Sequence, residues 1–462
     1  MQKYLIKDIG IVNEGSIVQG DVHIQNGRIE KIGSRLSAVG ASEIDGSGKF
    51  LLPGAIDDQV HFREPGLTHK ANIYTESRAA VAGGVTTFME MPNTMPPVFN
   101  QQLLEEKYAI ASRTSLANYS FFMGTSNENA GEALKTNQKK HDVCGIKIFM
   151  GSSTGGLLVD NYLTLNKLFS ESEVLIATHC EDERVIKKNY QDLKLQKPVL
   201  EAADHPIIRN TDACFESSFA AIQLAKKHDA RLHILHISTE KELQLFSNMM
   251  PLHQKRITAE VCVHHLHFTA DDYARLGYAI KCNPAIKAAH NREALWDALL
   301  DDRLDVIATD HAPHTMEEKG LERSAAEHNF LSRPNEEGLY ERTHAGLPLV
   351  QHSMALMLYY VRTGRLTIQK LAEKMSHAVA TCFQIENRGF IREGYWADVV
   401  IVNMDKPNVA RAGDLLYKCG WSPLEGFEFP AGIEKTFVNG HLAYDNGTIN
   451  ESQLGMRLKF NR

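Results

Sequence analysis

Short apolar runs that recur along the middle of the chain constrain its fold more than any other feature. They are separated by longer helical stretches at intervals of roughly 25 to 50 residues, which is typical of βα units around a parallel sheet. Eight such units predict an α/β fold, a (β/α)₈ TIM-like barrel with its site at the carboxyl ends of the strands. The eight runs are Ala55-Ile56 leading to His61, Val85–Glu90, Tyr119–Phe122, Gly145–Phe149, Val174–Thr178, Leu232–His236, Ile257–Val261 and Val306–Thr309.

The two ends of the chain alternate apolar and polar residues instead, which favours antiparallel strands. Asn26-Gly27 separates two such runs near the amino terminus, and Asn439-Gly440 separates two more near the carboxyl terminus. An Asn-Gly pair between alternating runs is a strong signal of a β-hairpin. We therefore predict a small composite β-sandwich domain from residues 1–52 plus 390–462, beside a barrel over residues 53–389.

Composition limits the kinds of molecule that this chain is expected to bind. The 462 residues are 43% hydrophobic and 23% charged, as in an ordinary globular protein, and the formal charge of −7 argues against nucleic acid or an anionic membrane. The seven cysteines form no CxxC spacing, so neither a disulfide framework nor a zinc ribbon is indicated. The chain shows no signal-peptide pattern and no apolar run near the ~18 residues of a membrane span. We expect a cytoplasmic protein with a small-molecule substrate.

Five side chains stand at or near the ends of the proposed strands, namely His61, Lys147, His179, His236 and Asp310. A lone histidine is more often a core or surface residue than a ligand, and this chain holds 21 of them. Because all five would lie at one barrel mouth, their shared position favours ligands over isolated core or surface residues. Imidazole nitrogens and carboxylate oxygens suit Zn²⁺, which activates water when one coordination position stays open.

Lys147 and Arg63 each allow two interpretations. A buried neutral lysine can react with CO₂ to give a carbamate that bridges two cations, whereas spacing alone favours an ion pair with Asp310. The planar guanidinium of Arg63 presents paired donors to a carboxylate, and beside a metal it would orient an acidic ring. The alternative for Arg63 is a surface ion pair with Glu64.

Six motifs in order carry a family resemblance. The chain resembles the dihydroorotases, in the class I branch of the cyclic amidohydrolases, from about Pro53 to residues 389–402. Six motifs in one order are far more specific than any one alone. They are Asp57-x-Gln59-x-His61-x-Arg63-Glu64-Pro65-Gly66, Gly83-Gly84-Val85-Thr86-Thr87, Met91-Pro92-Asn93-Thr94-x-Pro96, Glu260-Val261-Cys262-Val263-His264-His265-Leu266, Asn283-Pro284 and Asp310-His311-Ala312-Pro313-His314.

The resemblance implies a zinc-dependent enzyme that interconverts (S)-dihydroorotate and N-carbamoyl-L-aspartate in de novo pyrimidine (UMP) biosynthesis. It implies one or two zinc ions, with a carboxylated Lys147 as their bridge and Asp310 also as the proton-transfer residue. One zinc would be held by His61 and Asp310, and the other by His179 and His236. Arg63 and Asn93 would bind the substrate carboxylate, and the rest of the pocket would come from Asn283, His314 and the Ala345-Gly346 backbone. We also expect a homo-oligomer, with an enzyme of the same pathway as the candidate partner.

Gln59 departs from the family pattern, which has histidine there. An amide carbonyl binds Zn²⁺ less well than imidazole does. Three outcomes follow: a binuclear enzyme with one labile metal, a mononuclear enzyme, or a metal-poor relative without activity. Arg63 favours dihydroorotate over neutral hydantoins or allantoin. The alternatives are a hydantoinase-like or allantoinase-like hydrolase and a catalytically inactive scaffold.

Two further segments take structural interpretations. The adjacent His264 and His265 would point to opposite faces if extended, and neither is assigned to metal. The charged segment from Thr315 to Arg342 is interpreted as a lid, an oligomer contact or a solvated loop, the last being favoured. Asp57 is expected to orient a ligand or to stabilise the end of its strand.

Overall fold

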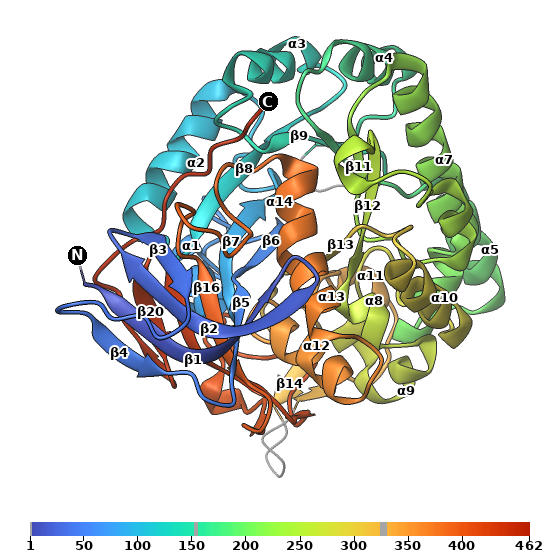
Figure 1. Cartoon of the computed structure of the whole chain (residues 1–462). Helices are drawn as coiled ribbons and strands as arrows, with labels where there is room; N and C mark the ends of the chain where they lie inside the picture. The colour runs from blue at the N-terminus through green and yellow to red at the C-terminus, as the bar shows by residue number, and fades with distance from the viewer. Residues whose placement is uncertain (1, 152–155, 324–329) are drawn as a thin grey trace.

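Eight parallel strands form the centre of the computed structural model, which describes residues 2–151, 156–323 and 330–462 (Figure 1). Neighbours in the chain are neighbours in the sheet, from β6 to β13. A parallel bridge between Val60 and His311 joins the last strand to the first, and His61 N donates to His311 O at 2.7 Å. The strands are β6 (Ala55–Val60), β7 (Val85–Glu90), β8 (Asn118–Gly124), β9 (Gly145–Phe149), β10 (Ile176–His179), β11 (Leu232–Ile234), β12 (Ile257–Cys262) and β13 (Val306–Ala308).

All eight predicted strands are present, which confirms the barrel. The bounds of β7 and β9 agree with the prediction, and the others differ by one to a few residues. Most of the strand residues are buried, because helices cover the outside and side chains fill the inside. Because both faces of each strand are buried, the strands appear in the sequence as continuous apolar runs rather than as alternating ones.

Helices follow most strands and wrap the barrel (Figure 1). Five of them begin after an asparagine or aspartate whose side chain accepts a backbone N–H of the first turn: Asn72, Asn100, Asn161, Asp182 and Asn210. Between β11 and β12 the described residues form only 3₁₀ turns. The helices are α1 (Ile73–Ala82), α2 (Gln101–Thr114), α3 (Ala130–Ala133), α4 (Tyr162–Glu171), α5 (Glu183–Gln196), α6 (His205–Ile208), α7 (Thr211–His228), α8 (Val263–His267), α9 (Tyr273–Leu276), α10 (Ala289–Leu300), α11 (Leu339–Arg342), α12 (Ser353–Arg362), α13 (Ile368–Ala372) and α14 (Ala378–Phe383).

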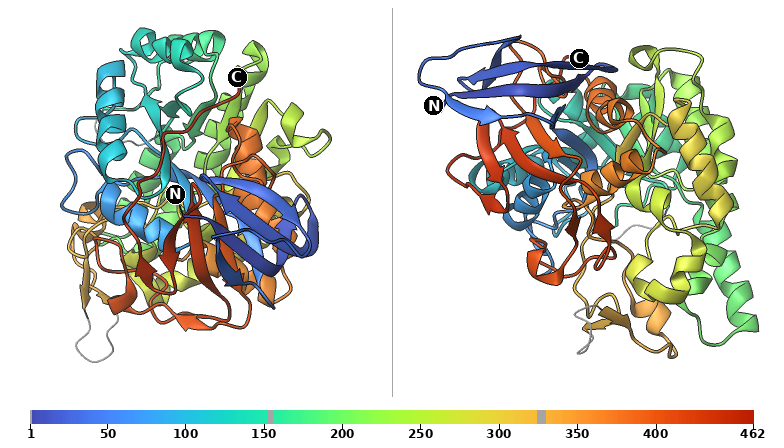
Figure 2. Two further views of the ribbon diagram at one scale, coloured as in Figure 1. Left: turned by 60° about the vertical axis from the view of Figure 1, so that its left-hand side comes forward. Right: turned by 60° about the horizontal axis from the view of Figure 1, so that its bottom comes forward.

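The two ends of the chain build one nine-stranded sheet beside the barrel (Figure 2), which confirms a β unit shared by both termini; its strand order is that of one sheet where a β-sandwich was predicted. β5 pairs antiparallel with β16, so the sheet joins strands from opposite ends of the sequence. The order is β21-β20-β19-β16-β5-β1-β2-β3, and β4 pairs with β1. The strands are β1 (Tyr4–Asn13), β2 (Ser16–Gln25), β3 (Arg28–Gly33), β4 (Ser42–Asp45), β5 (Phe50–Pro53), β16 (Val399–Asn403), β19 (Gly432–Val438), β20 (His441–Asp445) and β21 (Thr448–Ile449); a separate pair is β17 (Asn408–Val409) with β18 (Glu428–Phe429).

Both predicted hairpins are confirmed, and their turns touch. Asn26 and Gly27 have φ of 53° and 81°, and Asn439 and Gly440 have φ of 50° and 71°. Two successive positive φ angles are the signature of a type I′ turn, which fits the twist of the flanking strands. A Cβ added to Gly440 would lie 2.7 Å from Gly27 Cα. The two glycines therefore let the amino-terminal and carboxyl-terminal hairpins pack backbone against backbone.

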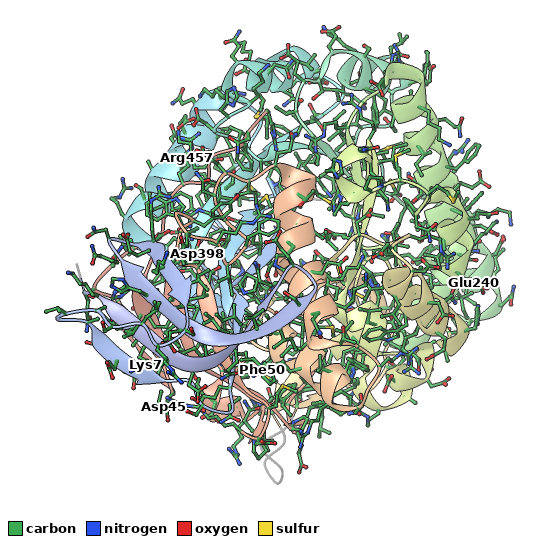
Figure 3. All side chains as sticks on the ribbon, in the orientation of Figure 1. Lys7, Asp45, Phe50, Glu240, Asp398 and Arg457 are labelled. Carbon is green, nitrogen blue, oxygen red and sulfur yellow. The ribbon has the colours of Figure 1, made fainter. Side chains whose placement is uncertain are left out.

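The last residues of the chain leave the terminal sheet and run along the barrel (Figure 1). Arg457 forms a parallel bridge with Tyr119, and its guanidinium contacts Glu105 on α2, where Figure 3 labels it. Leu458 and Phe460 are buried in a cluster with barrel residues such as Phe122. The exact domain boundaries at 52 and 390 stay a prediction.

The charged segment from Thr315 to Arg342 is partly described. It contains β14 (Leu321–Arg323) paired antiparallel with β15 (Phe330–Ser332), followed by α11, while residues 324–329 lie outside the described residues. In the described ranges of the chain, no helix combines the length and the apolar character that crossing a membrane requires.

Candidate active site

One cavity of about 290 Å³ lies at the carboxyl ends of the barrel strands, and every predicted site residue lines it. Parallel strands all end at the same mouth, so residues far apart in the sequence meet there. The lining comprises Gln59, His61, Arg63, Asn93, Lys147, His179, His236, Asn283, Asp310, His314, Ala345 and Gly346, together with Leu67, Lys70, Thr94, Met95, Phe149, Ala312 and His344.

His61 and Asp310 face each other across the closure of the barrel. His61 Nε2 lies 3.1 Å from Asp310 Oδ1, and His61 Nδ1 lies 2.7 Å from Asn93 Oδ1. Burial lowers the pKa of His61, although the Asp310 carboxylate opposes that shift. The amide oxygen of Asn93 thus accepts from Nδ1–H and leaves the Nε2 lone pair directed at Asp310. A neutral imidazole in this tautomer is the form that binds a metal.

His179 and His236 form the second pair. His179 Nδ1 lies 2.9 Å from His236 Nε2, and both rings are buried. On its other side, His179 Nε2 lies 3.1 Å from the carboxylate of Glu181, which Arg209 contacts in turn. Burial, with the positive charge of its neighbours, holds the pKa of His236 well below its usual value. The His236 imidazole is therefore suited to act as a neutral ligand.

Lys147 lies on β9 with 1% of its surface exposed. Burial lowers its pKa to about 7, while Glu260 and Asp310 oppose the shift. Among the described residues, no carboxylate lies within ion-pair distance of Nζ, which instead stands 4.6 Å from the centre of the Phe149 ring. The ion pair with Asp310 that spacing alone favoured is absent from this structure. A substantial fraction of this amine is neutral near pH 7.

Arg63 is 6% exposed and does not pair with Glu64. Its Nε donates to Pro313 O at 3.1 Å, and one terminal nitrogen lies 3.0 Å from His314 Nε2. Burial lowers its pKa to about 10. His314 in turn contacts Lys70, whose charge is met by Glu318 at 2.9 Å. Within the described chain, no carboxylate forms an ion pair with Arg63, so this cation faces the cavity without its own counterion.

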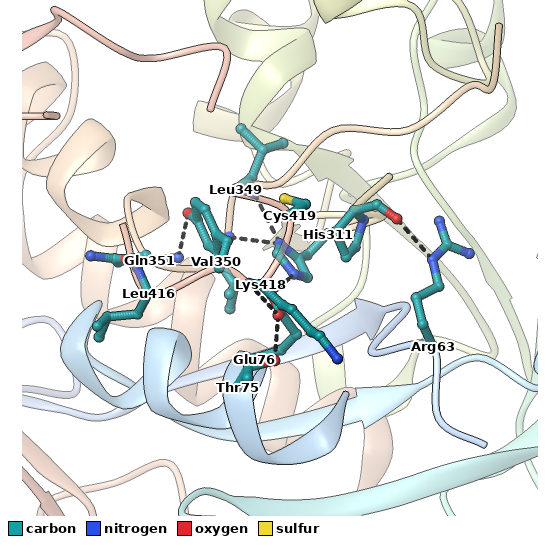
Figure 4. A network of polar contacts seen from close by, with 12 residues as sticks. Arg63, Thr75, Glu76, His311, Leu349, Val350, Gln351, Leu416, Lys418 and Cys419 are labelled. Atoms are coloured by element: carbon teal, nitrogen blue, oxygen red, sulfur yellow. Dashed lines mark hydrogen bonds and ion pairs between the residues drawn. The ribbon is translucent and has the colours of Figure 1, made fainter. Parts of the chain in front are cut away.

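A buried hydrogen-bond network surrounds His311, which follows Asp310 in the chain (Figure 4). His311 Nδ1 accepts the backbone N–H of Leu349 at 2.9 Å, and Nε2 lies 2.8 Å from Glu76 Oε2. Asp57 accepts from the Thr309 backbone at 3.2 Å and from its hydroxyl at 2.5 Å. Asp57 therefore stabilises the closure between β6 and β13. The sequence could place Asp57 near a strand end but not identify its partner.

Gln59 lines the cavity at 2% exposure, beside the position of His61. Its Oε1 lies 3.8 Å from Cys262 Sγ, which is within the range of a weak S–H donor. The donor set fits zinc: three imidazoles, one carboxylate and a lysine amine without an ion-pair partner converge on one polar cavity. Gln59 adds one neutral oxygen where an imidazole would bind more strongly.

Two other groups of candidate ligands occur in the described part of the chain, and neither includes a predicted ligand. They are Cys262 with His264 and His265, and Asp58 with His233 and Glu260. His264 and His265 are not extended: both lie in α8, and their rings stand 4.2 Å apart. Residues that sequence reasoning missed include Lys70, His344 and Phe149 in the lining and Glu181 behind His179. In the sequence, the only signal for Glu181 is its position two residues after His179.

Comparisons with known proteins agree with this geometry. Residues 50–443 match the amidohydrolase family. The dihydroorotase of Pyrococcus abyssi is 31% identical over 446 residues, which cover 96% of this chain and 96% of that protein. The dihydroorotase of Methanosarcina acetivorans is 33% identical over 464 residues, covering 96% and 92% respectively.

Solved structures show the same fold. The L-hydantoinase (dihydropyrimidinase) of Arthrobacter aurescens superposes with a TM-score of 0.88 at 25% identity, over 99% of this chain and all of that one. The dihydropyrimidinase of Brevibacillus agri gives 0.85 at 21% identity, with full coverage of both chains. On the strength of the family match and these near full-length similarities, the chain belongs to the amidohydrolase family, within which it is similar to dihydroorotases.

Proposed function

We propose that this cyclic amidohydrolase is a zinc-dependent dihydroorotase, which interconverts (S)-dihydroorotate and N-carbamoyl-L-aspartate in de novo pyrimidine biosynthesis. Similarity to dihydroorotases over nearly the whole chain supports the reaction class. The single observation that carries the choice of substrate is Arg63, a buried cation that faces the cavity without a carboxylate partner in the described chain.

The substrate carboxylate would supply that missing partner. Dihydroorotate and carbamoyl aspartate both carry a carboxylate, and a guanidinium binds it with two parallel hydrogen bonds. Hydantoin and allantoin lack this group, so a buried arginine would remain uncompensated beside them. Asn93, Asn283, His314 and the Ala345-Gly346 backbone line the same cavity and complete the proposed substrate pocket.

His61 with Asp310, and His179 with His236, would hold one or two zinc ions, with a carboxylated Lys147 between them. Bound zinc would supply a nucleophilic water at neutral pH and polarise the ring carbonyl. Lys147 suits carboxylation because its amine is buried and its pKa lies at about 7, so the nucleophilic neutral form is available to CO₂. Because of Gln59, zinc would bind more weakly at His61 and Asp310 than at His179 and His236.

Asp310 would move the proton. In ring opening its carboxylate accepts a proton from the attacking water and passes it to the leaving ring nitrogen. Ring closure reverses the direction, so the same oxygen first takes a proton from the attacking nitrogen of carbamoyl aspartate. Asn93 holds His61 by Nδ1, and His61 Nε2 fixes the orientation of Asp310 at 3.1 Å. Arg63 keeps the reacting carbonyl beside Asp310 throughout.

The deciding experiment is ring closure of N-carbamoyl-L-aspartate by the purified protein, followed at the dihydroorotate absorbance, with zinc per chain measured on the same sample. We expect turnover with one or two zinc ions per chain, loss of turnover after chelation, and recovery on adding zinc. Turnover of hydantoin or allantoin in place of dihydroorotate would contradict the proposed substrate. A folded, zinc-replete sample inert toward all three substrates would point to a scaffold.

We further propose that the enzyme acts in the cytoplasm as a homo-oligomer, with another pyrimidine-pathway enzyme as its candidate partner. The reaction supports only the cytoplasmic location, because neither nucleic acid nor membrane takes part in it. Sedimentation of the purified protein, alone and with the enzyme that makes carbamoyl aspartate, would test both assemblies.

A further inference from the structure

Three of the site residues, Arg63, His236 and Asp310, have backbone conformations that side chains rarely adopt, and the first two share a further feature. Arg63, just after β6, has φ of 70°, and His236, just after β11, has φ of 41°. Neither is glycine, so each conformation must be held by its surroundings. Both residues line the cavity and are buried. What holds their backbones therefore determines where their side chains point.

A buried glutamate on the next strand around the barrel accepts the backbone N–H of each residue. Arg63 N donates to Glu90 Oε1 at 3.1 Å, and Glu90 is the last residue of β7. His236 N donates to Glu260 Oε1 at 2.9 Å, and Glu260 lies on β12. Both glutamates are 0% exposed. The same arrangement thus occurs twice, on opposite sides of the site.

The second oxygen of each glutamate is anchored away from the cavity. Glu90 Oε2 lies 3.1 Å from Lys107 Nζ on α2, which itself donates to Met91 O. Glu260 Oε2 lies 3.4 Å from His233 Nε2, which in turn lies 3.1 Å from Asp58. Each carboxylate therefore has a contact on both sides, which restricts where its inner oxygen can lie.

We propose that Glu90 and Glu260 are positioning residues that act on different halves of the site. Glu90 fixes the backbone of Arg63 and so directs its guanidinium toward the substrate carboxylate. Glu260 fixes the backbone of His236 and so directs its imidazole toward zinc. The roles of Arg63 and His236 rest on the proposed function, whereas the two hydrogen bonds are independent of it.

The test separates the position of the accepting oxygen from the carboxyl group that carries it. E90D and E260D keep the carboxyl group but withdraw its oxygen by one methylene, whereas E90Q and E260Q replace the carboxyl group by an amide and keep a carbonyl oxygen in place. E242D is the matched control, because Glu242 is 2% exposed and accepts the hydroxyls of Ser218 and Thr239. Substitutions this conservative favour a folded protein in every arm.

We expect E260D to lower the zinc affinity of the apoprotein, measured by competition with a chelating dye, by about tenfold or more, with E260Q within about threefold of wild type. E90D should raise the KM for dihydroorotate and its Kd by calorimetry by about tenfold at a nearly unchanged zinc affinity, with E90Q close to wild type. E242D should change none of these quantities.

The inference is overturned if the glutamine variants lose as much as the aspartate variants, because the carboxyl group rather than the position of its oxygen would then be decisive. It is also overturned if E260D and E90D keep wild-type zinc affinity and KM, or if E242D shows the same losses. An inactive wild-type protein would refute the proposed function instead. In that case the zinc affinities of the Glu260 variants would still decide the inference for this half of the site.

Discussion

At the scale of the residue, the site buries more cations than it pairs with carboxylates. Arg63 has no carboxylate partner in the described chain, whereas Lys70 beside it is paired with Glu318. Lys147 has none either, and its pKa lies at about 7 because of burial. The two groups left without a carboxylate are those to which we assign a substrate and a carbamate.

Replacing Asp310 by asparagine tests the proton transfer. D310N keeps the shape of the side chain, so the fold should be intact, but the amide cannot accept a proton. We expect kcat for ring closure to fall by about 10³-fold or more, since proton transfer contributes 10² to 10⁴ and a metal ligand is also changed. The assay is dihydroorotate formation, with circular dichroism as the control for folding. Ordinary turnover in D310N would end the assigned role.

Replacing Arg63 by methionine tests carboxylate recognition. R63M preserves much of the buried length and removes the donors, so carboxylated ligands should lose about 2–4 kcal/mol of binding, as expected for one partner of a buried charge pair. A neutral hydantoin should lose much less. Calorimetric Kd values for dihydroorotate and hydantoin give the comparison, and equal losses for both would remove the case for Arg63.

At the scale of the element, the two hairpin turns form a second contact between the ends of the chain, besides the pairing of β5 with β16. Their Asn-Gly sequences are local signals, yet the contact of Gly27 with Gly440 is a tertiary one. A glycine in such a place serves both the positive φ of its own turn and the close approach of the other. This second role can be measured separately from the first.

G440A and G447A make a matched pair. Both glycines have positive φ, 71° and 96°, but a Cβ at Gly440 meets Gly27 Cα at 2.7 Å, while nothing lies within 4 Å of a Cβ at Gly447. We expect G447A to lower the free energy of unfolding by about 1 kcal/mol and G440A by roughly 2–4 kcal/mol. Urea denaturation of both variants checks this, and equal effects would show that the turns do not need to touch.

At the scale of the whole molecule, a buried charge cluster inside the barrel links stability to pH. His233 stands between Asp58 and Glu260, and all three are fully buried. Burial opposes protonation of His233, but the two carboxylates outweigh it and raise its pKa to about 9. The protonated ring therefore balances part of the negative charge under the site.

The folded protein should lose stability as the pH rises through about 9. A histidine with a pKa near 6.5 when unfolded and about 9 when folded contributes stability that is fully present below 6.5 and is lost through 9. The contribution is on the order of 3 kcal/mol. Chemical denaturation of the apoprotein at pH 6.5 and 9.5 measures it. H233N should show a smaller decline over this range, and the proposed charge state is wrong if the two proteins decline in parallel.

Much of the fold was predictable because each barrel strand is apolar on both faces and each turn carries its own local signal. Val85–Glu90 and Gly145–Phe149 are strands with the predicted bounds for this reason. The grouping of His61, Lys147 and Asp310 was predictable because parallel strands end at one mouth.

What could not be predicted depends on register between strands. Glu90 reaches Arg63 and Glu260 reaches His236 only because of how adjacent strands are aligned, and no local pattern encodes that alignment. The short helix that contains His264 and His265 was missed for a similar reason. Its five residues are too few to show helical periodicity after a strand.

The pairing of β5 with β16 has a consequence for the nascent chain. Leu52 pairs with Val400, so the ribosome must make nearly the whole barrel before the partner of β5 exists. At about 5–20 residues per second that delay is roughly 20 to 70 s, during which the β5 edge is unpaired and can join other chains. Chaperone supply during translation should therefore limit the yield of this protein more than its final stability does.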